Sequence, residues 1–242
     1  PQLGLRVAGD DGQVLYADTT AAESALLNDW WYVEGIKFTI PPNLAGQSFA
    51  ASVSLIPAYL YTNLDAVAYD EFDRADASGD LGTSTSGHTW ANDSGFDIAS
   101  NKARPNAAAL QIPTVDIGKA DFAAFVSLSN LSSDSDEGAG FTFRFVDASN
   151  YWLAFVFDGT DQVLLQKVVA GTPTTVATAA WTPADTAELR LIVQGDRIRL
   201  WVDRVLVIDE EDSDLNTATK HGLTTQGTTT VDFDHFAVLG LS

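Results

Sequence analysis

The sequence predicts an all-β protein whose main part is a sandwich or barrel of antiparallel sheets. From residue 67 onward, short apolar stretches are separated by turn-forming residues at intervals of about 8–12 residues, which is typical of such folds. Within several stretches the apolar residues recur with a period of two, as in Phe141, Phe143 and Phe145, so one face of each strand is apolar. The sequence after residue 67 contains no long amphipathic helical pattern.

A boundary between two units is predicted near Thr62-Asn63-Leu64-Asp65, a turn-like segment that interrupts two apolar stretches. We therefore expect a small β module over residues 1–66 and a larger domain over residues 67–242. In the small module, Gly9-Asp10-Asp11-Gly12 lies between two apolar stretches and predicts a β-hairpin.

The rest of the small module holds a predicted helix and a tryptophan pair. The capping-box spacing of Thr20 and Glu23 predicts a short helix over about 20–29. Trp30 and Trp31 are adjacent, so on a strand their side chains face opposite ways. They are either two core residues or an assembly contact with a partner chain.

Charge and composition exclude several functions. The 242 residues carry 13 basic and 33 acidic side chains, a formal net charge of -20, which disfavours binding to nucleic acid or to an anionic membrane. There is no cysteine, so disulfides, thiolate metal sites and thiol catalysis are excluded. No apolar run approaches the roughly 20 residues of a membrane span, so we expect no membrane insertion. No basic, apolar segment precedes Pro1, which predicts assembly in the cytoplasm.

Four segments, which follow one another in order between Asp70 and Phe236, resemble those of concanavalin A-like lectin/glucanase domains of the laminin G-like group. They are Asp70–Asp76 with Leu81-Gly82-Thr83 and Trp90, Glu137–Trp152, Arg199–Val207, and His221–Phe236. The resemblance implies a two-sheet jelly roll. One departure is Arg204, at a turn where Gly or Asn-Gly is usual because the turn needs positive φ, so a longer turn or another turn type is expected there.

The resemblance also implies a setting, because domains of this kind without signal peptides occur in tail and other virion proteins of bacteriophages. We therefore expect a non-enzymatic virion structural protein of the minor tail or fibre type, assembled in the host cytoplasm as a homo-oligomer with other virion proteins. Its jelly roll would serve surface adhesion, for example to a host-surface glycan, or subunit reinforcement. The alternatives are a capsid decoration protein and a carbohydrate-binding module of a bacterial surface enzyme.

Enzymatic activity is not expected. Glucanases of this fold place two carboxylates on one strand so that both point into the cleft. The nearest run of acids, Asp209–Asp214, contains adjacent acids that would point to opposite faces, and it lacks the apolar setting that raises the pKa of a catalytic acid. No nucleophile elbow, Walker loop or dinucleotide fingerprint is present, so no cofactor is required.

A face of tryptophan and arginine is the first candidate binding site. If the loop between Val146 and Asn150 holds an odd number of residues, Arg144 lies opposite Trp152, away from the large apolar residues. Trp201 alternates onto the side of Arg199 and Arg197. Such a face suits glycan stacking or a protein interface, and it can also be the packed rim of a sheet.

A structural calcium ion is the second candidate, because Ca²⁺ is held mainly by carboxylate and carbonyl oxygens. One acidic group lies in a Ser/Asp-rich loop, and the other lies near the first and last strands of the jelly roll, which are often adjacent. The alternative is that these acids are simply solvated. The candidate ligands are Asp134, Asp136, Glu137, Asp70, Asp73, Asp232 and Asp234.

Overall fold

The computed structural model describes residues 66–131, 138–157, 161–182, 184–227 and 230–241, together with four short strands nearer the N-terminus. These are β1 (Leu3–Leu5), β2 (Leu15–Ala17), β3 (Trp31–Tyr32) and β4 (Ile56–Pro57). The chain divides into two compact units, Pro1–Leu64 and Asp65–Ser242. The dividing point lies two residues before the predicted one. The described part of the chain holds no helix long and apolar enough to cross a membrane.

Within the first unit the described strands form two antiparallel pairs. β1 pairs with β2 in the register Leu3–Ala17, as the hairpin motif predicts, and β3 pairs with β4. The helix predicted over about 20–29 lies outside the described residues.

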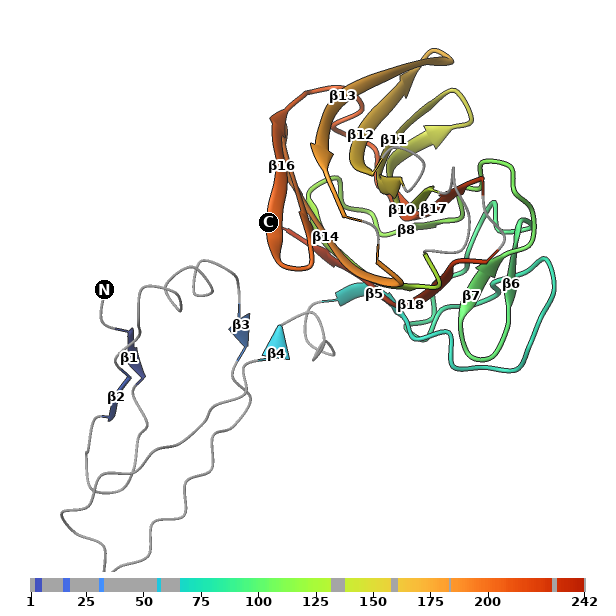
Figure 1. Ribbon diagram of the computed structural model, residues 1–242, viewed down its shortest axis with the longest axis horizontal. Coiled ribbons are helices and arrows are strands. Elements are labelled where there is room, and N and C mark those ends of the chain that lie inside the picture. Colours follow the sequence, from blue (N-terminus) through green and yellow to red (C-terminus); the bar gives the residue numbers. More distant parts are fainter. Residues whose placement is uncertain are drawn as a thin grey trace, which may run out of the picture. The chain divides into compact units, whose positions relative to one another are not determined.

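The second unit is a sandwich of two antiparallel sheets, which confirms the predicted all-β class (Figure 1). One sheet has six strands in the order β13-β12-β11-β10-β17-β8. Its strands are β8 (Thr114–Asp116), β10 (Gly138–Asp147), β11 (Asn150–Phe157), β12 (Gln162–Val169), β13 (Thr172–Ala180) and β17 (Lys220–Gln226).

The other sheet has eight strands in the order β16-β15-β14-β9-β18-β7-β6, and β5 also pairs with β18. The first and last strands of the jelly roll are therefore neighbours, with Asp70 opposite Phe236. Its strands are β5 (Ala66–Asp70), β6 (Phe96–Ile98), β7 (Ala103–Pro105), β9 (Phe122–Ser129), β14 (Thr186–Gln194), β15 (Arg197–Val202), β16 (Val205–Glu211) and β18 (Asp232–Gly240).

The main core lies between the two sheets and collects alternate residues of the strands, as period-two patterning requires. On β14, for example, Leu189, Leu191 and Val193 are fully buried in this core. The residues that alternate with them, such as Glu188 and Arg190, therefore lie on the outer face of the eight-stranded sheet.

The strand β11 departs from the predicted one-sided pattern because both of its faces are buried. Trp152 and Ala154 belong to the main core, whereas Tyr151, Leu153 and Phe155 form a second cluster on the opposite face of the six-stranded sheet. The large apolar residues of this strand therefore do not mark the core side.

The predicted pairing of Arg144 with Trp152 is wrong, and a β-bulge is the reason. Asp147 pairs with Asn150 across a tight turn, and the register then shifts so that Phe143, not Arg144, lies opposite Trp152. Arg144 takes a positive φ of 47° within this irregularity. As a result, Phe143 lies in the main core and Phe145, two residues on, lies in the second cluster.

The turn between β15 and β16 keeps the short form of a two-residue hairpin, contrary to the expectation of a longer or different turn. Val202 pairs with Val205, and the two turn residues between them, Asp203 and Arg204, have φ values of 48° and 70°. Positive φ at both central positions is the geometry usually given to Asn-Gly. A backbone bond from Asp203 N–H to the Glu188 carbonyl helps to hold the turn.

Candidate binding hollow on the eight-stranded sheet

A hollow of about 540 Å³ lies on the eight-stranded sheet, and five separate segments contribute to it. Ser127 and Ser129 of β9 and Thr186 of β14 provide hydroxyl groups on the strands that cross it. The full set of lining residues is Lys102, Ser127, Leu128, Ser129, Thr186, Ala187, Glu188, Asp203, Arg204 and Asp234.

Strand pairing explains why these residues meet. Ser127 lies opposite Glu188 on one side and opposite Asp234 on the other, so three strands place these side chains in one row on the outer face. Ser129 lies opposite Thr186 in the next row. The hollow is therefore built on paired strands rather than on loops alone.

The charged groups around the hollow are paired with one another. Lys102 Nζ donates to Asp234 Oδ2 at 3.0 Å, and Arg204 Nε lies 3.7 Å from Glu188 Oε2. Asp203 Oδ1 accepts the backbone N–H of Glu188 at 2.9 Å. All these side chains are partly exposed, so the hollow offers both donors and acceptors to a molecule from solution.

Trp201 of β15 comes two residues before Asp203, which lines the hollow, but is not itself one of the lining residues. It pairs with Arg190, and the guanidinium carbons of Arg190 and Arg199 lie 5.2 and 5.6 Å from its ring centre. Trp201 thus lies on the same face as Arg199, as predicted, but its side chain is buried, with only 9% of the residue exposed. The arginines pack over the ring, so Trp201 offers no free stacking face to a ligand.

Arg144 and Trp152, the other half of the predicted tryptophan–arginine face, are fully buried. Trp152 stacks on Phe143 with ring centres 5.6 Å apart, and its Nε1–H donates to the Asp214 carbonyl at 3.0 Å. Arg144 donates to the Gly195 carbonyl. Neither side chain reaches a surface where a ligand could contact it, so the register shift removes both from the candidate site.

The outer face of the six-stranded sheet is filled by apolar side chains instead. The second cluster consists of buried residues, with the rings of Phe145 and Tyr151 stacked at 6.2 Å. Its buried members are Phe145, Tyr151, Leu153, Phe155 and Val168. None of these five is more than 8% exposed, and Phe157, which packs against them, is partly buried.

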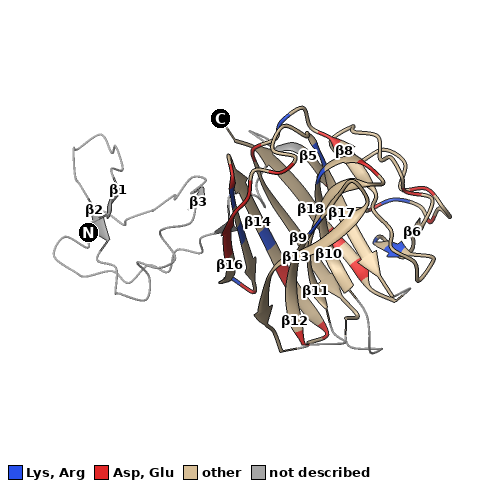
Figure 2. Cartoon of the chain, turned by 90° about the horizontal axis from the view of Figure 1, so that it is seen from above, with Lys and Arg blue, Asp and Glu red and all other residues tan. Residues whose placement is uncertain are grey.

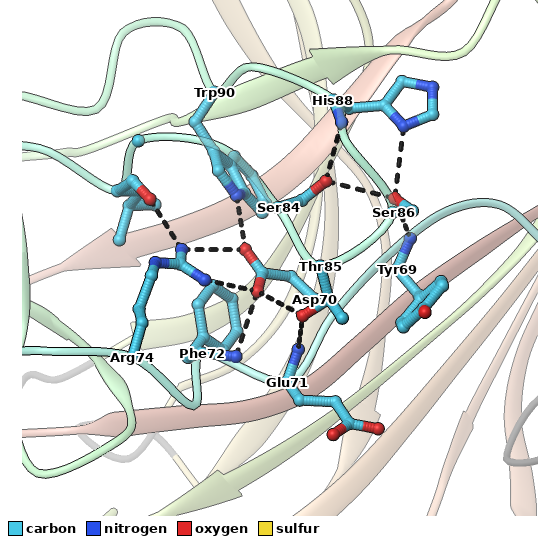
Figure 3. Close-up of polar contacts among 12 residues, drawn as sticks. Tyr69, Asp70, Glu71, Phe72, Arg74, Ser84, Thr85, Ser86, His88 and Trp90 are labelled. Carbon is cyan, nitrogen blue, oxygen red and sulfur yellow. Dashed lines mark hydrogen bonds and ion pairs between the residues drawn. The ribbon is translucent and has the colours of Figure 1, made fainter.

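Asp70, a predicted calcium ligand, is the centre of an internal hydrogen-bond network (Figure 3). Its carboxylate accepts two bonds from Arg74, at 2.7 and 2.9 Å, and one from Trp90 Nε1 at 2.8 Å. The backbone N–H of Phe72 and the hydroxyl of Thr85 complete the set. The motif that carries the family resemblance thus fixes the first strand in place, because a fully buried carboxylate needs such partners.

The other predicted calcium ligands do not converge. Asp232 accepts two bonds from Arg104, at 2.6 and 3.0 Å, while Asp234 is paired with Lys102 and Asp73 is exposed. Among the residues that the structure describes, no group of three or more acidic or histidine side chains could hold a metal ion. Asp134, Asp136 and Glu137 lie outside the described residues.

The acidic run Asp209–Asp214 is engaged in ion pairs. Asp209 accepts a bidentate pair from Arg197, and Lys167 donates to both Asp212 and Asp214. The charge of Arg197, hydrogen-bonded to Asp209, lowers the pKa of that carboxyl. Figure 2 shows this acidic strand, β16, and the basic position on β14 of the same sheet.

The predicted assembly contact is described only in part. Trp31 begins β3, where it pairs with Pro57, and Trp30 lies outside the described residues. The hollow itself was not predicted, because serines and threonines on strands form no sequence motif. The one available signal was the alternation of Glu188 and Arg190 with apolar residues, which indicates a polar outer face on β14.

No protein-family model matches the chain, and no curated protein sequence matches it. Solved structures do resemble it. The carbohydrate binding module CBM66 from Bacillus subtilis covers 68% of this chain and 95% of its own length at 19% identity, with a TM-score of 0.52. The GH43 protein BlXynB from Bacillus licheniformis aligns over 96% of this chain at 15% identity, with a TM-score of 0.55, and this chain spans 45% of that protein.

The two-sheet arrangement and these similarities define a concanavalin A-like lectin-type β-sandwich. At such low identities the likeness concerns the fold, and a fold of this kind supports many functions.

Proposed function

We propose that this chain is a non-enzymatic carbohydrate-binding module whose binding site is the hollow on the eight-stranded sheet. The observation that carries the proposal is the set of hydroxyl, carboxylate, ammonium and guanidinium groups that five segments bring around one hollow of about 540 Å³. This volume lies within the range of about 300–1,000 Å³ typical of small-molecule sites. The fold likeness to the carbohydrate binding module CBM66 from Bacillus subtilis supports the same class.

The chemistry fits a saccharide because each sugar hydroxyl both donates and accepts hydrogen bonds. Glu188 and Asp234 accept, Lys102 and Arg204 donate, and Ser127 can do both. A site on paired strands keeps its geometry better than one on loops.

The test is a panel of soluble polysaccharides and a glycan array probed with the full chain. Thr186→Trp places an indole in the hollow at an exposed strand position, and Thr178→Trp makes the same change on exposed β13 of the other sheet. We expect binding by the wild type, a loss of at least about tenfold in Thr186→Trp, and no change in Thr178→Trp. Circular dichroism confirms that both variants fold. Absence of binding to every saccharide, or equal binding by the two variants, contradicts the proposal.

We also propose the setting that the family resemblance implies, in which copies of the module assemble with other proteins of a bacteriophage virion. The expected role is surface adhesion, and a capsid decoration protein or a module of a bacterial surface enzyme are the alternatives. Mass spectrometry of purified virus particles tests this setting. Several copies per particle would support it, and absence from the particles would overturn it while leaving saccharide binding untouched.

A further inference from the structure

We infer that the hollow selects neutral saccharides over acidic ones such as uronic acid or sulfated glycans. The inference rests on the proposed function and names its ligand class. The residues that line the hollow include two basic ones, Lys102 and Arg204, and three acidic ones, Glu188, Asp203 and Asp234.

Each basic group of the hollow already has an acidic partner. Lys102 Nζ lies 3.0 Å from Asp234, and Arg204 Nε lies 3.7 Å from Glu188. Both cations keep further N–H groups, so a carboxylate or sulfate of a ligand could reach them, but only beside their acidic partners. The negative charge of the ligand would then be repelled by that of Asp234 or Glu188. A sugar hydroxyl, in contrast, can bond to either member of a pair without this repulsion.

The charge of the rest of the domain acts in the same direction. Residues 67–242 carry 11 of the 13 basic and 26 of the 33 acidic side chains, so the domain is strongly negative. Such a field repels anionic ligands at low ionic strength and leaves neutral ones unaffected.

The paired geometry also suits neutral hydroxyl groups. Ser127 lies in one row with Glu188 and Asp234, so a hydroxyl acting as donor or acceptor stands between two carboxylates. Each hydroxyl of a sugar ring can donate to a carboxylate of this row and accept from a hydroxyl of it.

The experiment is a glycan array holding neutral oligosaccharides and oligosaccharides bearing uronic acid, sialic acid or sulfate, probed with the full chain at low and high salt. We expect neutral glycans to give the strongest signals, and these signals to stay constant when salt rises. Acidic glycans that bind at least as strongly as neutral ones overturn the inference but leave the proposed function intact. Binding to nothing overturns both.

A charge variant gives a second test. The double variant Glu188→Gln with Asp234→Asn leaves Lys102 and Arg204 without these acidic partners. The affinity for acidic glycans should therefore rise at least tenfold relative to that for neutral glycans, and high salt should remove this increase. Asp209→Asn is the matched control, because it releases Arg197 on the same sheet but outside the hollow. Equal gains in the variant and the control would contradict the inference.

Discussion

The imidazole of His221 accepts a hydrogen bond at Nδ1 from the backbone N–H of Arg144, with the two nitrogens 3.1 Å apart. Its Nε2–H donates to the Lys119 carbonyl at 2.8 Å, and its ring lies 3.8 Å from that of Phe122. These contacts tie β17 to β10 at the bulge that sets the register. They also require a neutral ring, because Nδ1 must stay an acceptor.

The first prediction concerns pH. Burial lowers the pKa of His221 to about 4, with the charge of Arg144 acting in the same direction, while the Lys119 carbonyl and Asp116 oppose the change. Between this value and the ordinary value near 6.5, the unfolded chain binds more protons than the native one. The contribution of His221 to the free energy of unfolding is therefore complete above about pH 6.5. It falls by about 3 kcal/mol as the pH drops to about 4.

Urea unfolding at about pH 7.5 and about pH 4.5 measures this effect. His221→Gln is the reference, since glutamine does not titrate while the carboxylates of the domain titrate in both proteins. We expect the stability advantage of the wild type over the variant to shrink at the lower pH. Parallel losses in the two proteins would show that His221 does not contribute.

The second prediction concerns the network around Asp70. Asp70→Asn removes the charge that pairs with Arg74 and turns an amide N–H₂ toward the donors around it, so we expect a loss of about 3 kcal/mol or more in the free energy of unfolding. Asp73→Asn, at an exposed position three residues away, should change it by less than about 0.5 kcal/mol. Similar effects of the two substitutions in urea unfolding would argue against a structural role for Asp70.

A third prediction tests the burial of Trp152. Trp152→Ala should lower the free energy of unfolding by about 3–5 kcal/mol, because it empties a large volume next to Phe143 in the main core. Val205→Ala, at a position 62% exposed, is the surface control and should have little effect. If Trp152→Ala costs no more than the control, Trp152 does not lie in the main core and β10 and β11 pair in a different register.

The turn between β15 and β16 supports a stabilising substitution. Arg204 has a φ of 70°, which costs a residue with a Cβ about 1 kcal/mol, so Arg204→Gly should raise the free energy of unfolding by about 0.5–1 kcal/mol. The ion pair lost with Glu188 is well exposed and contributes little. Arg197→Gly, in the extended part of β15, should instead destabilise the protein. Thermal unfolding that gives both variants the same sign of change would contradict this prediction.

Much of the fold could be predicted from local patterns. Period-two strands, turn residues at regular intervals and the motif around Asp70 together predicted a two-sheet sandwich whose first and last strands are adjacent. The alternation that places Trp201 with Arg199 was predictable as well, because β15 pairs with β14 without a register shift over this stretch.

The site was less predictable, for physical reasons that particular residues illustrate. One bulge after Phe143 reverses the faces of the residues that follow, and nothing in the sequence at Arg144 marks it, since a positive φ is usually found at Gly or Asn. Both faces of β11 are buried, and the face with more large apolar residues, Tyr151, Leu153 and Phe155, is not the one in the main core. The sequence pattern therefore placed Trp152 on the wrong face. The hollow depends on pairings between strands distant in sequence, such as Ser127 with Glu188 and with Asp234.

The most direct measurement of saccharide binding in the hollow is a map of backbone amide chemical shifts during titration of the full chain with a neutral oligosaccharide selected from the array. We predict that the largest changes fall on β9, β14 and β18 around Ser127, Glu188 and Asp234. Changes confined to the six-stranded sheet, around Tyr151 and Phe155, would contradict a binding site in the hollow.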